Sequence, residues 1–220
     1  LRGRTSPSEG YYSGSGSGET GWAPIMGVGY YQNLSQWSKG EYTAASNTQD
    51  DLVVIAENGA LPRSDDAGNT TASAASLAGS SNNGSVQVAR DGLISKPDDA
   101  DVYAFVSGSG NLQFTVSPAP LGPNLDIRAE LLDSSGAVIA SVNPDTSLAA
   151  TLSATVTSGA YYLRIDAVGR GDPATAYSDY GSLGAYRISG SYADTGAQGP
   201  VAAFSAAPTS GTVPLPVSFD

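Results

Sequence analysis

The chain contains neither histidine nor cysteine among its 220 residues. Histidine nitrogens and cysteine sulfurs are the usual zinc ligands, and histidine is the general base of the common serine hydrolase triad. Their absence excludes an H-E-x-x-H zinc hydrolase, a serine hydrolase of that form and a disulfide scaffold. We therefore predict that the chain is not an enzyme and that it binds no zinc.

Basic residues and long apolar runs are also scarce. The 10 Lys and Arg stand against 21 Asp and Glu, which gives a formal net charge of −11 and a pI near 4.2. So acidic a chain is a poor partner for a nucleic-acid backbone or an anionic membrane surface. No apolar run approaches the roughly 18 residues that span a bilayer. The composition predicts a secreted, extracellular protein with neither nucleic acid nor membrane as its partner.

Residues typical of turns occur along most of the chain, which has 27 glycines. From Leu61 onward, strand-like runs recur between the turns, at 86–89, 101–106, 111–116, 126–132, 137–141, 148–156, 160–166 and 185–192. Alternation is clean in several of them: Leu112, Phe114 and Val116 share a face opposite Gln113 and Thr115. This pattern predicts a mainly β fold, with an antiparallel sandwich or jelly roll over residues 61–192.

Residues 1–60 show little regular pattern and are expected to be mostly irregular, with one short helix. Thr48 and Asp51 approximate a capping box in front of the apolar run Leu52–Ile55. The spacing predicts a helix over 48–57 that stops at Asn58-Gly59. A buried strand at 52–56 is the alternative, because short apolar runs fit both structures.

Several motifs occur in a fixed order between Asp65 and Tyr192. They are Asp65-Asp-Ala-Gly-Asn-Thr70, Pro97-Asp-Asp-Ala-Asp-Val-Tyr-Ala-Phe105, Gly122-Pro-Asn-Leu-Asp-Ile127, Leu131-Leu-Asp-Ser-Ser-Gly136, Gly159-Ala-Tyr-Tyr-Leu-Arg-Ile165 and Tyr180-Gly-Ser-Leu-Gly-Ala-Tyr-Arg-Ile188. In this order they resemble the bacterial pre-peptidase C-terminal domain, a β-sandwich appended to many secreted proteases. The resemblance implies a non-catalytic accessory module that assists export, maturation or substrate attachment.

The flanking segments carry two further resemblances. The run Gly21-Trp-Ala-Pro-Ile-Met-Gly-Val-Gly-Tyr-Tyr31 resembles the Met-turn of metzincin-like zinc metallopeptidases, and residues 1–60 resemble the end of such a catalytic domain. That family's histidines are missing, so Met26 is expected to pack beneath Trp22 and Tyr30. After a polar linker at 193–200, residues 201–220 resemble the first strands of a PKD domain.

A separated remnant of a catalytic domain would expose apolar side chains. Trp22, Ile25, Tyr30 and Trp37 would need a new partner, either the sandwich or a second copy of the chain. We therefore expect residues 1–60 to be the least ordered part, or to self-associate, unless they dock on the sandwich.

An acidic cluster is the best candidate for a metal site. Asp98, Asp99 and Asp101 are closely spaced, and Asp65 and Asp66 lie upstream. Calcium takes six to eight hard oxygen ligands, which closely spaced aspartates and backbone carbonyls can supply. The alternative is that these aspartates only solvate a turn and that Asp101 caps a strand.

Tyrosines suggest a second, alternative function. A tyrosine offers stacking area and a hydroxyl, which suits sugar or peptide ligands. The candidates for binding an extracellular polymer, either a polysaccharide or a collagen-like protein, are Tyr162, Tyr177, Tyr180 and Tyr186. Adjacent Tyr161 and Tyr162 must face opposite sides of a strand, whereas Tyr186 and Tyr192 share a face. A structural role for most of these tyrosines is the competing interpretation.

Overall fold

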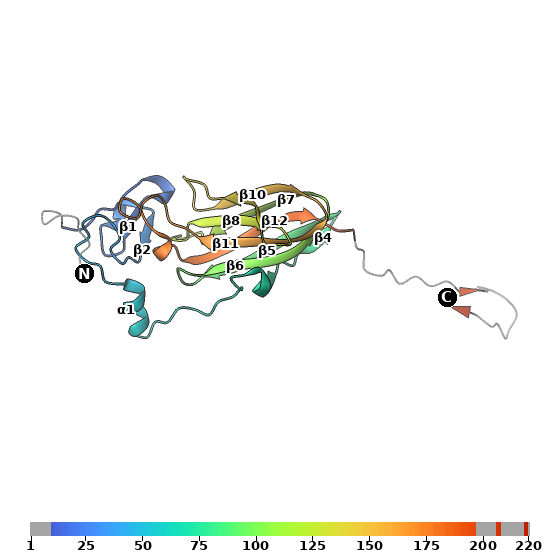
Figure 1. The fold of residues 1–220 in the computed structure, drawn as a ribbon, viewed down its shortest axis with the longest axis horizontal. Coiled ribbons are helices and arrows are strands. Elements are labelled where there is room, and N and C mark those ends of the chain that lie inside the picture. Colours follow the sequence, from blue (N-terminus) through green and yellow to red (C-terminus); the bar gives the residue numbers. More distant parts are fainter. Residues whose placement is uncertain (1–9, 197–205, 208–217, 220) are drawn as a thin grey trace.

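A computed structural model of the chain describes residues 10–196, 206–207 and 218–219. Two five-stranded sheets pack face to face, and an N-terminal segment with one short α-helix lies at one end of them (Figure 1). The predicted mainly β sandwich with a mostly irregular N-terminal segment is confirmed. Residues 1–9, 197–200 and most of the PKD-like stretch lie outside the described residues, so the domain boundaries stay predictions.

The strands of the sandwich are all antiparallel to their neighbours except β3, which pairs parallel with β6. The first sheet has the order β10-β7-β12-β5-β4 and consists of β4 (Ser80–Asn82), β5 (Ser85–Ile94), β7 (Gly110–Pro118), β10 (Ala150–Val156) and β12 (Gly184–Ala193). The second has the order β3-β6-β11-β8-β9 and consists of β3 (Ala75–Ser76), β6 (Ala100–Ser107), β8 (Ile127–Leu132), β9 (Val138–Val142) and β11 (Gly159–Ala167).

The remaining elements are short. The parallel pair β1 (Trp22–Pro24) and β2 (Leu34–Gln36) lies in the N-terminal segment, and β13 (Ala206–Ala207) pairs antiparallel with β14 (Ser218–Phe219). Four 3-10 turns are η1 (Gly18–Thr20), η2 (Gly29–Tyr31), η3 (Thr71–Ser73) and η4 (Asp179–Gly181). All eight predicted strand runs are strands in the structure, while β1 to β4 were not predicted.

Alternating side chains build the core between the sheets. Leu112, Phe114 and Val116 are buried, whereas Gln113 on the opposite face is exposed. Phe105 from the other sheet meets Phe114 edge-to-face, with ring centroids 5.4 Å apart. The period-two pattern therefore assigned the core face of β7 correctly.

The helix α1 (Asp51–Glu57) begins three residues later than predicted. Its N-cap is Asp50, whose carboxylate accepts a hydrogen bond from the Val53 N–H at 3.0 Å. The expected capping box of Thr48 with Asp51 is therefore wrong, because Asp50 satisfies the first turn instead. The helix ends at Glu57 with Asn58 as its C-cap, and Gly59 follows with φ +95°, which favours glycine.

The N-terminal segment docks on the end of the sandwich. Trp22 is 5% exposed and packs with Tyr42 of its own segment and with Leu148 and Tyr177 of the sandwich. The sandwich, one of the two partners anticipated for this segment, therefore covers Trp22 in the structure.

Several apolar side chains of this segment stay uncovered. Ile25, Met26 and Trp37 are about two-fifths exposed, and Tyr30 is 91% exposed. The expectation that Met26 packs beneath Trp22 and Tyr30 is wrong, since Tyr30 points into solvent and Met26 is 44% exposed. Docking thus covers the tryptophan of β1 but leaves the following residues, Ile25, Met26 and Tyr30, at the surface.

We predict that Phe114→Ala lowers the free energy of unfolding by about 3–5 kcal/mol. The ring is fully buried and packs against Phe105, so truncation leaves a cavity that both sheets line. Urea denaturation measures the change. Gln113→Ala on the exposed face is the control and should stay within about 0.5 kcal/mol of wild type. Equal losses for the two variants would contradict this account of the core.

Candidate metal centre

Three of the five candidate aspartates lie together at one end of the sandwich. One carboxylate oxygen from each of Asp65, Asp99 and Asp101 lies within 4.8 Å of the other two. Asp99 immediately precedes β6 and Asp101 is its second residue, while Asp65 belongs to the irregular segment between α1 and the sandwich. The site thus joins two separate parts of the chain.

Asp99 and Asp101 are buried, with 1% and 0% of their surfaces exposed. Asp99 Oδ2 accepts hydrogen bonds from the Ser95 N–H at 2.7 Å and the Ser95 hydroxyl at 3.0 Å. Asp101 Oδ2 accepts one from the Tyr186 hydroxyl. These contacts hold one oxygen of each carboxylate in place.

The other oxygens of the two carboxylates are unsatisfied. Asp99 Oδ1 and Asp101 Oδ1 are buried without a hydrogen-bond partner among the described residues. A buried polar atom without a partner is costly, and in native proteins such an atom calls for an explanation such as an ion. Burial raises the pKa of Asp101 to about 7, with the neighbouring aspartates adding to the effect. The chain has therefore placed hard oxygen donors where a cation would satisfy them.

The remaining two candidates lie outside this trio. Asp66 is exposed and accepts a hydrogen bond from the Leu93 N–H at 3.0 Å. Asp98 is exposed and pairs with Lys96 at 3.4 Å. The prediction of five converging carboxylates is therefore corrected to three, because Asp66 fastens β5 and Asp98 points away into solvent.

Tyr186 belongs to the core rather than to an exposed row. It is 3% exposed, and besides Asp101 it bonds the Tyr103 hydroxyl at 2.7 Å. Its ring passes over Gly92, where an added Cβ would lie 2.3 Å from the ring carbon Cζ. Tyr192 shares this core face as expected, and its exposure is 7%. Tyr186 is therefore too buried to stack on a ligand, and this part of the tyrosine hypothesis is wrong.

Tyr177 and Tyr180 hold the N-terminal segment to the sandwich. The Tyr177 hydroxyl donates to Asp126 at 2.7 Å, and its ring stacks near Trp22. The Tyr180 hydroxyl donates to Asp50 at 2.6 Å and accepts from the Leu52 N–H at 2.8 Å. At 3% and 6% exposure, neither tyrosine offers a face to a polymer.

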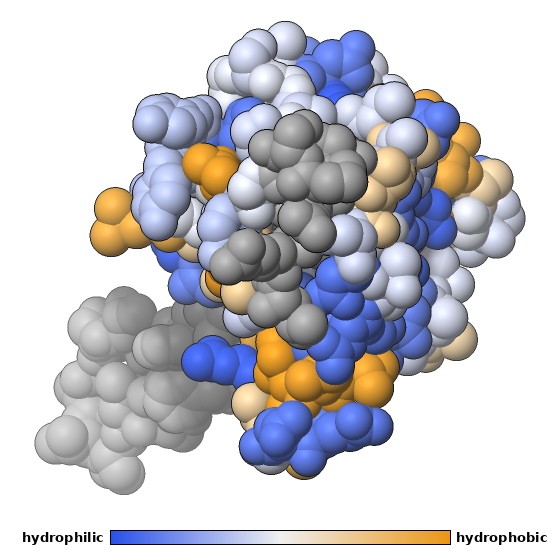
Figure 2. Space-filling view, turned by 90° about the vertical axis from the view of Figure 1, so that its left-hand side faces the viewer, coloured by the Kyte–Doolittle hydropathy of each residue, from blue (hydrophilic) through white to orange (hydrophobic). Residues whose placement is uncertain are grey.

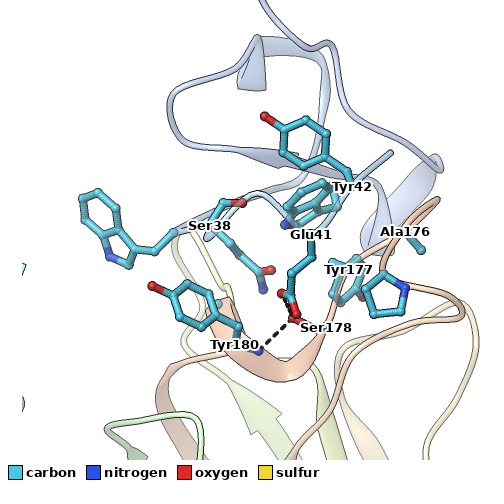
Figure 3. A pocket seen from close by; sticks show the side chains of 12 residues that line it. Ser38, Glu41, Tyr42, Ala176, Tyr177, Ser178 and Tyr180 are labelled. Atoms are coloured by element: carbon cyan, nitrogen blue, oxygen red, sulfur yellow. Dashed lines mark hydrogen bonds between the residues drawn. The ribbon is translucent and has the colours of Figure 1, made fainter. Parts of the chain in front are cut away.

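Figure 3 shows the small pocket at this junction, where Glu41 accepts a hydrogen bond from Ser178 and the ring of Tyr180 lies beside them. Its volume of about 10 Å³ has room for about one water molecule. This pocket beside Glu41 and Tyr180 is therefore too small to hold a substrate.

Only Tyr162, among the four tyrosine candidates, is partly exposed, on the outer face of β11. Tyr161 beside it points into the core, so the expected opposition of the two side chains is confirmed. Ion pairs surround Tyr162's strand on this face, with Arg164 pairing to Glu130 and Arg128 pairing to Asp166. The tyrosines do not form a coplanar row within the described sandwich.

Sequence reasoning missed a buried ion pair beneath the N-terminal segment. Asp126 is fully buried, and Arg170 reaches it at 2.9 Å while also pairing with Asp145. The sequence pattern makes Asp126 the first residue of a strand, and its partner Arg170 stands 44 positions later in the chain. No local pattern pairs residues so far apart.

Comparison with known proteins adds only distant structural likenesses. No protein-family model matches the chain, and no curated protein matches its sequence. It is similar to the pre-peptidase C-terminal domain of a collagenase from Bacillus anthracis, at 19% identity and a TM-score of 0.36, over 47% of this chain and 88% of that one. It is also similar to PliG, a periplasmic inhibitor of g-type lysozyme from Aeromonas hydrophila, at 12% identity and a TM-score of 0.33, over 54% and 95% of the two chains. Such distant likenesses leave the functional argument to the residues of this chain.

We predict that in excess chelator the free energy of unfolding falls as the pH rises from about 4 to about 7. The Asp101 carboxyl has its pKa raised to about 7 in the folded state, whereas an unfolded aspartate titrates near 3.8. Between these values the folded state binds the extra proton, so stability is lost as that proton leaves. Urea denaturation across this range measures the effect.

Asp101→Asn is the matched variant for this pH measurement, because it keeps the shape and removes the titration. The difference in stability between wild type and variant should grow toward pH 7, with the variant relatively more stable there. A difference that stays constant with pH would contradict the assignment.

Proposed function

We propose that the chain is a non-catalytic accessory module of a secreted bacterial zinc metallopeptidase, and that calcium bound by Asp65, Asp99 and Asp101 stabilises its sandwich. The observation that carries the calcium site is the pair of buried, unpartnered oxygens on Asp99 and Asp101. The peptidase context is supported by the resemblance of residues 21–31 to a Met-turn.

Calcium fits the donor set better than zinc does. All three groups offer hard carboxylate oxygens, and the site contains none of the nitrogen or sulfur ligands that zinc prefers. Three carboxylates would supply part of the six to eight ligands, with backbone carbonyls and water completing the shell. A divalent cation would also neutralise the repulsion between carboxylates that lie within 4.8 Å of each other.

The position of Asp65 gives the cation a structural role. Residues 58–66 between α1 and the sandwich are all exposed and form neither helix nor strand. Asp65 is the point where this segment meets the buried carboxylates of Asp99 and Asp101. A cation held by all three would fasten the segment to the start of β6.

The outer face of β7 and β10 favours an accessory module over polymer binding. The outward side chains of β7 and β10 pair across the strands as hydroxyls and amides, as in Gln113 with Ser153 and Thr115 with Thr151. None of the described outward residues on these strands is aromatic. Stacking platforms for sugars are therefore absent from this face of the described sandwich.

An extracellular or periplasmic location accords with the role of a secreted accessory module. The acidic composition is that of an exported protein, with a net charge of −11. In the part of the chain that the structure describes, no helix has the length and apolar character needed to cross a membrane.

We expect millimolar calcium to raise the melting temperature by several degrees relative to excess chelator. Binding stabilises the folded state by about 2.7 kcal/mol at a hundredfold excess over Kd. For a domain of this size each kcal/mol shifts the melting temperature by about 2–4 °C. Scanning calorimetry of the full chain measures the shift, and magnesium at the same concentration tests the preference for calcium. An unmoved melting temperature would remove the case for the site.

Variants separate metal binding from folding. Asp99→Asn and Asp101→Asn should fold in chelator yet lose most of the calcium shift, whereas Asp91→Asn, an exposed partner of Arg187, should keep it. A second readout is trypsin cleavage after Arg63, two residues before Asp65 in the exposed segment. Calcium should slow this cleavage in wild type and not in Asp65→Asn. Equal protection in both proteins would place the cation elsewhere.

We also expect no zinc-dependent cleavage of casein or gelatin by the purified chain. The prediction follows from the missing histidine ligands. Hydrolysis that zinc restores and a chelator abolishes would overturn the accessory role while leaving the calcium site untouched.

A further inference from the structure

β10 is an edge strand of the first sheet. In the described sandwich it pairs with β7 on one side and with no strand on the other, and it runs along the upper margin of the sandwich in Figure 1. In an antiparallel ladder, every second residue of an edge strand directs its backbone N–H and C=O groups away from the neighbouring strand. β10 therefore presents a row of backbone donors and acceptors along its outer edge.

The other three edges of the described sandwich are short or irregular. β4 and β3 have three and two residues, and the register of β9 against β8 shifts between Leu131 and Leu132. Short edge strands and bulges prevent sheets from joining edge to edge. β10 instead has seven residues in unbroken register with β7, so it is the one long, regular edge of the described sandwich.

The sequence around β10 is uncharged. Residues 146–158 contain no Asp, Glu, Lys, Arg or Pro, and residues 110–118 and 134–144, which include β7 and β9, contain no charged residue either. Charged side chains, lysine above all, and proline are the residues that keep natural edge strands apart. The composition of this edge therefore does not oppose the addition of another strand.

The outward side chains of β10 match themselves when the strand is reversed about Ser153. They are Thr151, Ser153 and Thr155, and all three are exposed. An antiparallel copy centred on Ser153 would set Thr151 opposite Thr155 of the second copy, and Ser153 opposite its own counterpart. Hydroxyl side chains directly opposite each other are favourable cross-strand pairs.

The core-facing side chains of β10 match in the same register. Ala150 would lie opposite Val156 of the second copy, and Leu152 opposite Ala154, so each pair joins a larger side chain to a small one. Ala154 is only partly buried at this margin of the core. An added strand would cover it, and both faces of β10 therefore fit a second copy of the same strand.

We propose that two copies of the chain join through β10 in antiparallel register about Ser153, so that their two five-stranded sheets form one continuous sheet. A two-fold axis through Ser153 would relate the copies, and each contact would be made twice. An extended segment of another protein could use the same backbone groups, but the self-matching sequence favours a second copy. The contact lies on the sandwich and is separate from residues 1–60.

Sedimentation velocity of the full chain measures the association over a range from about 10 μM to about 1 mM protein. We expect a reversible dimer that becomes tighter when NaCl is raised from about 50 mM to about 500 mM, because salt screens the repulsion between two acidic copies. Ser153→Lys should raise the dissociation constant about tenfold, since it sets two lysines opposite each other on the two-fold axis.

Two double variants test the register. Thr151→Lys with Thr155→Lys sets like charges opposite each other and should abolish the dimer, whereas Thr151→Lys with Thr155→Asp sets opposite charges together and should retain it. Gln113→Lys adds the same charge on the exposed face of β7, away from the edge, and should dimerise like wild type. An unchanged melting temperature verifies that each variant is folded.

Figure 2 shows the competing surface for self-association, a hydrophobic patch toward the lower edge of the N-terminal end, where α1 lies. Val53 of this helix is 49% exposed. A dimer that Val53→Lys dissociates and Ser153→Lys preserves would move the contact to that patch and overturn the proposal.

Three further results would overturn the proposal. The first is a chain that stays monomeric over the whole concentration range at both salt concentrations. The second is a dimer that Gln113→Lys weakens as much as Ser153→Lys does, which would show a general effect of added charge. The third is loss of the dimer in the lysine–aspartate variant, which would exclude the register about Ser153.

Discussion

Asp101 brings a carboxylate into the end of the core, and Tyr186 from the opposite sheet donates a hydrogen bond to it. Tyr103, two residues along β6, bonds the same tyrosine hydroxyl, so one chain of hydrogen bonds joins the two sheets. Gly92 is required beneath the Tyr186 ring because no Cβ fits there. The arrangement satisfies one oxygen of Asp101 and leaves the other buried without a hydrogen-bond partner among the described residues, in a carboxylate that lies close to those of Asp65 and Asp99. A cross-sheet core contact thereby also positions one carboxylate of the candidate metal centre.

A second buried carboxylate organises the opposite side of the same end. Asp126 receives hydrogen bonds from Tyr177 and Arg170, and Tyr177 packs against Trp22 of the N-terminal segment. Removing Arg170 would leave the buried charge of Asp126 unpaired, which is more costly than losing a surface ion pair. The N-terminal segment is thus attached by the packing of Trp22 on Tyr177 and by the hydrogen bonds of Tyr180 with Asp50 and Leu52.

The sequence predicted what depends on local pattern. Eight strands follow from alternation between turn residues, but β3 and β4 are too short to show a period. The helix start was misplaced because Thr48, Asp50 and Asp51 are all good capping residues, and only the fold decides among them. For the candidate site, local spacing found Asp99 and Asp101 and wrongly included Asp98. Burial of the tyrosines depended on partners in other strands, which no local pattern reveals.

The candidate metal centre joins two segments of chain that form neither helix nor strand. One is the exposed segment 58–66, which contains Asp65, and the other is the 95–97 loop just before Asp99. The Ser95 N–H and hydroxyl already hold one oxygen of Asp99, so this loop is tied to the carboxylate without a cation. Among the described residues Asp65 has no such tie to β6, and a cation held by Asp65, Asp99 and Asp101 would supply it.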